Sequence, residues 1–159
     1  MHGISASPKK WNRNTQALYR PEIQKKRIGQ KAYDEGWENC KKNSKVGLLA
    51  TEGTLKTGVY NNFFDEEYNL LKPSESIQKN SVNKAIKFVK MGNVRAAEKA
   101  IKPAINYLMS MKCKKIILGC TELPIAIFAF KSFKNIKSSK IFLDPNLILA
   151  ESAMTKHKN

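Results

Sequence analysis

The pattern of apolar and polar positions changes along the chain near residue 45. Residues 1–45 are polar and poorly periodic, and Pro8 and Pro21 break any long element, so we expect an irregular segment with one or two helical stretches. From there on, short apolar runs alternate with stretches of helical spacing. The pattern predicts an irregular N-terminal arm over residues 1–44 and one folded domain over 45–159.

Four short apolar runs predict strands in this domain. The first covers 46–51 and is followed directly by the rest of the TEGT motif, residues 51–54. A short apolar run that leads into such a loop is typical of a buried parallel strand. The second covers 68–72 and stops at Pro73. The remaining two cover 115–118 and 140–143. Each run is too short for a helix of ordinary length.

Helical spacing of apolar residues predicts the connecting elements. A helix is expected over 77–91 with Gly92 as its stop, and another over 94–108, in which Pro103 costs a backbone hydrogen bond and should introduce a kink. Two shorter helices are expected over 57–64 and 147–154.

Strands that alternate with helices predict an α/β domain, a four-stranded parallel sheet with helices on both faces, because parallel neighbours need crossover connections. Such sheets bind ligands beyond the carboxyl ends of their strands. The letters TEGT after the first strand and CTE after the third both fall at that edge.

The net charge of +16 suggests an anionic partner such as nucleic acid. However, only four of the basic residues are Arg, and the charge is divided between residues 1–45, with +7, and 46–159, with +9. Lysines on solvated faces explain this distribution as well, so the charge does not favour nucleic acid as the partner.

The three cysteines are odd in number and lack paired spacing, and no signal peptide precedes them, so we expect free thiols in the cytoplasm. No run of about 18 apolar residues predicts a membrane span. His2 and His157 lie near the termini, far from the other candidate residues, so neither a metal cluster nor a Cys–His pair is expected.

The stretch IILGCTELP, residues 116–124, presents a thiol, a hydroxyl and a carboxylate in succession at Cys120, Thr121 and Glu122. A free Cys after an apolar strand is often a small buried hydrophobe. Its place at a strand end instead favours an exposed thiol, and a helix starting there would lower its pKa from about 8.5 toward neutrality. Cys113 is expected to be structural.

The other candidate motif is the TEGT loop, where Thr51, Gly53 and Thr54 offer two hydroxyls and room for a ligand to approach the backbone. This suits a carboxylate or a phosphate, although an ordinary capped turn is equally consistent with the letters. The loop matches no nucleotide-binding motif.

Taken together, VGLLATEGTLKTGVY and IILGCTELP resemble, in order and spacing, the second half of the aspartate/glutamate racemase family, which includes hydantoin racemase relatives. The segments YNLLKPSESIQ, FVKMGNV and FLDPNLILAESAM extend the resemblance over residues 45–155. It implies one half of a two-domain fold in which two similar α/β halves hold an amino acid between them.

The resemblance also implies a function, that of an isomerase of amino-acid metabolism that needs neither pyridoxal phosphate nor a metal. Family members place a cysteine on either face of the substrate Cα, so that one thiolate removes the α-proton and the opposite thiol returns one. The implied substrate is a small amino acid such as aspartate or glutamate, and a homodimer is compatible with the sequence. Cys120 corresponds to the second cysteine, and the implied substrate-binding residues in this half are Thr51, Gly53, Thr54, Thr121, Glu122 and Lys90.

The family's first cysteine lies in a CNTxH motif, which here reads Arg13-Asn14-Thr15-Gln16-Ala17. By this match Asn14 and Thr15 bind substrate, while Arg13 replaces the cysteine and cannot act as an acid or base near neutral pH. Only 12 residues precede Arg13, so we expect a truncated chain with a remnant of the first half. Two hypotheses stay open: a racemase completed by another chain, and a catalytically inactive remnant or small-carboxylate-binding domain.

Overall fold

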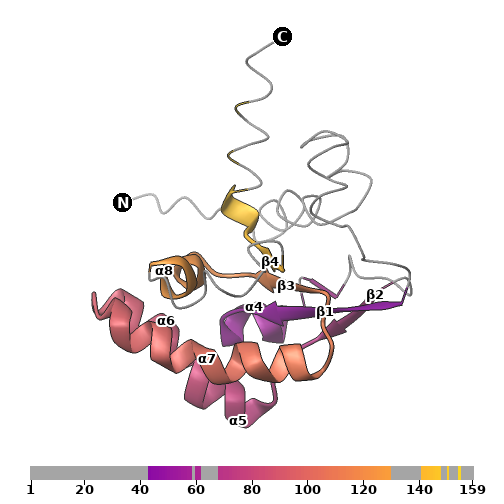
Figure 1. Ribbon diagram of the computed structural model, residues 1–159, viewed down its shortest axis with the longest axis horizontal. Helices are drawn as coiled ribbons and strands as arrows, with labels where there is room; N and C mark the ends of the chain where they lie inside the picture. Colours follow the sequence, from indigo (N-terminus) through magenta and orange to yellow (C-terminus); the bar gives the residue numbers. More distant parts are fainter. Residues whose placement is uncertain are drawn as a thin grey trace, which may run out of the picture.

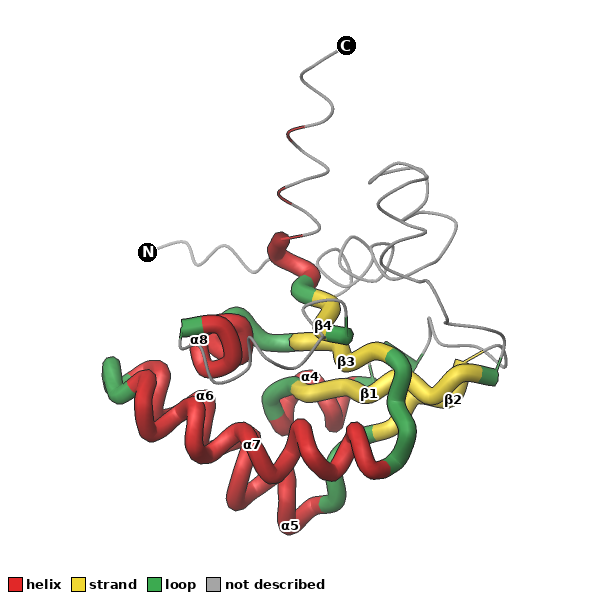
Figure 2. Tube along the Cα trace, viewed as in Figure 1, coloured by secondary structure: helices red, strands yellow, loops and turns green. Residues whose placement is uncertain are grey.

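The computed structural model describes residues 43–58, 60–61, 68–129, 141–147, 150 and 154 (Figures 1 and 2). The predicted arm lies outside the described residues except at its last two positions, where Ser44 already belongs to the first strand. Arg13, Asn14, Thr15, Cys40 and both histidines therefore also lie outside them.

The described strands form one parallel sheet in the order β2-β1-β3-β4. Their bounds are β1 Ser44–Leu49, β2 Tyr68–Leu71, β3 Lys115–Leu118 and β4 Phe142–Leu143. In register, Val46 of β1 pairs with Leu70 of β2, and Leu49 of β1 pairs with Leu118 of β3. The predicted four-stranded parallel sheet of an α/β domain is confirmed.

Helices connect the strands. Their bounds are α4 Glu52–Thr57, α5 Glu75–Ile77, the π-helical turn η1 Gln78–Val82, α6 Asn83–Lys90, α7 Val94–Ser110 and α8 Glu122–Phe128. After β4, residues 145–147 are helical, and the Asp144 carboxylate accepts hydrogen bonds from the backbone N–H groups of Asn146 and Leu147. No helix in these ranges is long and apolar enough to cross a membrane.

Helices α6, α7 and α8 contact one another beside the sheet (Figure 1). Their apolar side chains form a buried cluster with Leu49, Ile116 and Leu118, which lie on one face of the sheet. A Cβ atom at Gly47 would lie 2.7 Å from Leu108 Cδ1, so a larger residue there would collide with α7. Val46, Leu48 and Ile117 point to the other face and are also buried, as expected for central parallel strands.

Of the helix predicted over 57–64, only residues 57, 58, 60 and 61 lie within the described residues, and they hold the end of an earlier helix and a turn. Helix α4 begins at Glu52, immediately after the first strand, because the Thr51 hydroxyl caps it by accepting a hydrogen bond from the Thr54 backbone N–H. It ends where Gly58 adopts a left-handed conformation with φ 62°, which a Gly tolerates without strain. The TEGT motif is thus the first turn of the helix.

The helix predicted over 77–91 is present but contains the π-helical turn η1, and Ser81 in that turn reaches α7. Pro103 in α7 has no N–H to donate to the preceding turn. Next to it, the Ser81 hydroxyl accepts from the Ala104 N–H at 3.2 Å and donates to the Ala100 carbonyl at 2.5 Å. The inserted hydroxyl occupies the place of one backbone hydrogen bond, and α7 continues through Pro103 as one helix.

Candidate functional site

The two sequence motifs meet at the carboxyl edge of the sheet. Strands β1 and β3 end side by side, and the Gly119 N–H donates to the Leu49 carbonyl at 2.7 Å. A Cβ atom at Gly119 would approach Ala50 Cβ to 3.1 Å and Tyr60 Oη to 3.2 Å. A residue without a side chain therefore lets the chain after β3 pass close to the chain after β1.

In the TEGT loop the two threonine hydroxyls contact each other, with 3.0 Å between Thr51 Oγ1 and Thr54 Oγ1. Both side chains are only partly buried. A Cβ atom at Gly53 would meet only Thr51 Oγ1, at 3.9 Å, so the backbone there is open. The loop is a capped helix start that still presents hydroxyl groups and accessible backbone at the edge.

Cys120 contacts the carboxylate that follows it in the sequence. Its Sγ donates to Glu122 Oε2 at 2.6 Å, and the Thr121 hydroxyl donates to the same oxygen at 3.0 Å. Lys90, at the end of α6, places its Nζ 3.6 Å from Glu122 Oε1. The Glu122 side chain is 20% exposed and that of Lys90 is 64% exposed, so the cluster lies at the protein surface with the carboxylate at its centre.

These contacts raise the pKa of the Cys120 thiol to about 11, chiefly through burial and also through its hydrogen bond to the Glu122 side chain. The backbone N–H of Glu122 and the charge of Lys90 act in the opposite direction but are weaker. The expectation of a pKa lowered toward neutrality is therefore wrong. The pKa of Glu122 is lowered, first because the carboxylate accepts the Cys120 hydrogen bond. Near neutral pH the pair is a thiol beside a carboxylate.

Cys113 lies at the other end of β3, ahead of Lys115, and it is buried. Burial raises its pKa to about 11. The position and burial agree with a structural thiol, as predicted. Across the described residues, no group of three or more His, Cys, Asp or Glu side chains could hold a metal ion.

Two further polar residues lie near the site, Gln78, which ends the segment YNLLKPSESIQ of the family resemblance, and Asn83, which no motif indicated. Gln78 is buried, and its Nε2 donates to the Ala50 carbonyl at 2.9 Å and to Asn83 Oδ1 at 2.8 Å. Asn83 in turn donates to Glu52 Oε1 at 2.5 Å. These bonds tie η1 and α6 to the loop after β1. The resemblance of YNLLKPSESIQ to the family indicated Gln78, whereas Asn83 left no signal of its own in the sequence.

Comparison with known proteins agrees with this arrangement. Residues 27–153 match the family model described as Asp/Glu/Hydantoin racemase. A glutamate racemase of Carboxydothermus hydrogenoformans is 26% identical over 129 residues, covering 76% of this chain and 44% of the relative. An uncharacterized protein of Pectobacterium carotovorum, from the region 3' of pnlA, is 34% identical over 85 residues, covering 53% of this chain and 56% of the relative.

A structural comparison reaches the same result. The solved structure of Picrophilus torridus aspartate racemase superposes with a TM-score of 0.54 at 25% sequence identity, covering 76% of this chain and 49% of that one. The chain thus spans about half the length of the relatives it matches. With a family model that matches most of its length and the same fold, the chain belongs to the Asp/Glu/hydantoin racemase family.

Proposed function

We propose that this chain transfers a proton at the Cα of a small acidic amino acid such as aspartate or glutamate, without a cofactor, and that Cys120 is its acid/base group. The observation that carries the proposal is the contact between Cys120 Sγ and Glu122 Oε2, at 2.6 Å, at the carboxyl edge of the sheet. Relatives named glutamate racemase and aspartate racemase support the substrate class.

The pKa of about 11 makes Cys120 a proton donor in the resting protein. In the donating direction the S–H bond breaks, a C–H bond forms at the carbanionic Cα, and a thiolate remains. In the opposite direction Cys120 first loses its proton to solvent, and the thiolate then removes the α-proton, which restores the S–H bond and leaves a carbanion at Cα. The positive substrate ammonium group would favour the thiolate form.

Substrate binding is assigned to the groups around this pair. The hydroxyls of Thr51, Thr54 and Thr121 and the open backbone at Gly53 suit the α-carboxylate and the amine. Lys90 contacts Glu122 in the free protein but is 64% exposed, so a substrate side-chain carboxylate can compete for it. The roles of Asn14 and Thr15 rest on the resemblance alone.

Racemisation needs a second acid/base group on the opposite face of Cα. Cys113 cannot supply it, because it is buried at the far end of β3, and the resemblance aligns Arg13 with the other cysteine. We therefore propose that Cys120 serves one face of the reaction and that full inversion requires a second acid/base group, supplied by a partner half, on the opposite face of Cα. The proposed location is the cytoplasm, and the proposed partner is a free amino acid rather than a nucleic acid or a membrane.

The test is exchange of the α-proton for deuterium in D₂O, followed by ¹H NMR separately for the D- and L-forms of aspartate and glutamate. We expect one enantiomer to exchange, with loss of exchange in Cys120→Ser. Cys113→Ala is the matched control because it removes a thiol outside the site. Equal exchange in Cys120→Ser, or none in the unmodified chain, would overturn the catalytic role.

A second candidate is binding of small carboxylates without catalysis. It is favoured by the raised pKa of Cys120, which leaves little thiolate at neutral pH, and by the hydroxyl groups of the TEGT loop. Saturable binding of aspartate or glutamate that weakens in Thr51→Val, together with an absence of deuterium exchange, would select this function.

A further inference from the structure

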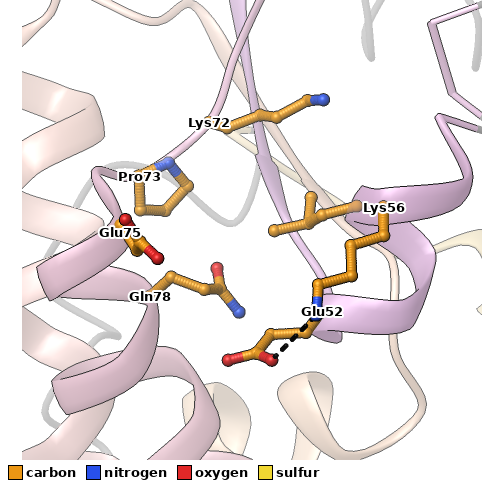
Figure 3. A pocket seen from close by; sticks show the side chains of 7 residues that line it. Glu52, Lys56, Lys72, Pro73, Glu75 and Gln78 are labelled. Atoms are coloured by element: carbon orange, nitrogen blue, oxygen red, sulfur yellow. Dashed lines mark ion pairs between the residues drawn. The ribbon is translucent and has the colours of Figure 1, made fainter.

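A pocket lies beside the loop after β1, between α4, the end of β2 and α5 (Figure 3). The pocket has a volume of about 290 Å³, near the lower limit for small-molecule sites. Its lining residues are Glu52, Leu55, Lys56, Lys72, Pro73, Glu75 and Gln78. Cys120, Thr51 and Thr121 are not among them, so this pocket is separate from the proposed catalytic group.

The innermost polar residue of the pocket is Gln78, which is only 5% exposed. Its Nε2 is used, since it donates to the Ala50 carbonyl and to Asn83 Oδ1. Its Oε1 is buried and accepts no hydrogen bond. Figure 3 shows this oxygen pointing toward the space between Pro73 and Lys56. A buried carbonyl without a donor is unfavourable, so the pocket favours a ligand that brings an N–H or O–H group.

The rim of the pocket carries charges of both signs. Lys72 and Glu75 form no ion pair with any described residue. Lys56 Nζ lies 3.9 Å from Glu52 Oε2, and both side chains are more than half exposed. A purely cationic or purely anionic ligand would leave one sign of charge unmatched, whereas a ligand with both an ammonium and a carboxylate group matches both.

We propose that this pocket binds a small zwitterion of the free amino-acid class. The ammonium group donates to Gln78 Oε1 and faces the Glu75 carboxylate, and the ligand carboxylate faces Lys72 and Lys56. The proposal does not depend on the chemistry of Cys120. Gln78 also donates a hydrogen bond to the Ala50 carbonyl, and Asn83 donates one to Glu52. A ligand in the pocket therefore contacts residues that are bonded to the loop carrying Thr51.

The test is an NMR titration of ¹⁵N-labelled protein that carries Cys120→Ser, so that the pocket is probed without turnover at the other site. The probes are glycine and glutamate as zwitterions, with acetate and methylammonium as ligands that carry one charge each. We expect the Gln78 side-chain amide signal to shift with the zwitterions at millimolar concentration, and to shift much less with either single-charge probe.

Three variants separate the pocket from nonspecific binding. Lys72→Met and Glu75→Gln each remove one rim charge without touching the buried bonds of Gln78, and each should weaken binding about tenfold, as expected for the loss of a charge-assisted contact. Lys84→Met, on the exposed side of α6, is the control and should leave the affinity unchanged.

Shifts confined to residues around Thr51 and Thr121 would overturn the proposal, because they would place the amino acid only at the edge near residue 120. Unchanged affinity in both Lys72→Met and Glu75→Gln would also overturn it. So would the absence of any shift at Gln78, which would mean that the pocket holds water only.

Discussion

Replacement of Ser81 by Ala should destabilise the protein by about 2 kcal/mol. Ser81 is 2% exposed, and its hydroxyl makes two hydrogen bonds to the backbone of α7, at Ala100 and Ala104. Each such bond contributes about 0.5–1.5 kcal/mol net, and a buried N–H or carbonyl left without a partner costs a similar amount. Pro103 already removes one donor from the same turn, so the helix has little to replace the lost contacts.

Urea unfolding followed by far-UV circular dichroism measures this loss as a lower midpoint at an unchanged slope. For a domain of this size the melting temperature should fall by about 4–8 °C. The matched control is Ser110→Ala, in the same helix, where an exposed hydroxyl donates to the Tyr107 carbonyl at 2.7 Å. That change should stay within about 0.5 kcal/mol. If the two variants were equally stable, the inserted hydroxyl would not support α7.

Three further predictions follow from the contacts described above. Glu122→Gln should lower the pKa of Cys120, because the Glu122 carboxylate raises it. Alkylation of Cys120 by iodoacetamide at pH 8, followed by mass spectrometry, should then become about three- to tenfold faster. An unchanged rate would contradict the effect of Glu122 on the thiol. Gly47→Ala should cost about 1–3 kcal/mol in thermal unfolding, and adding Leu108→Ala should cost less than the two single effects together. The folded pKa of Cys113 is raised from 9.0 to about 11, so its thiol ionises more readily in the unfolded chain, and the free energy of unfolding should fall between pH 9 and 11. In Cys113→Ala the free energy of unfolding should fall less steeply over the same range, and equal slopes for the two proteins would refute this.

Several features of the fold could be predicted because burial leaves a direct trace in the sequence. Strands β1 and β3 are buried on both faces, and both read as continuous apolar runs. Alternation with helical spacing then implied a parallel sheet, and parallel strands bring their carboxyl ends to one edge. For that reason the meeting of the TEGT and CTE motifs was predictable from the chain alone.

Local hydrogen bonds were harder to predict. The letters TEGT were interpreted as a loop before a helix at 57–64, although Thr51 as a cap and Gly58 as a stop define α4 as Glu52–Thr57. These six residues contain no fully buried side chain, so the helix has no apolar periodicity to reveal it. The π-helical turn was also missed, since Ser81 forms its bonds with α7, 19 and 23 residues further along the chain.

The protonation state of Cys120 shows most clearly what the sequence determines and what the tertiary structure decides. Its position at the end of a strand, next to a hydroxyl and a carboxylate, was determined by the sequence. Its pKa was decided by the tertiary structure, because burial and a 2.6 Å contact with Glu122 outweigh the nearby backbone N–H and the charge of Lys90. The pairing of Lys90 from α6 with Glu122 from α8 likewise exists only once the two helices pack together. The succession of residue types along the chain is a local property, whereas desolvation and contacts between charges depend on which elements the fold brings together.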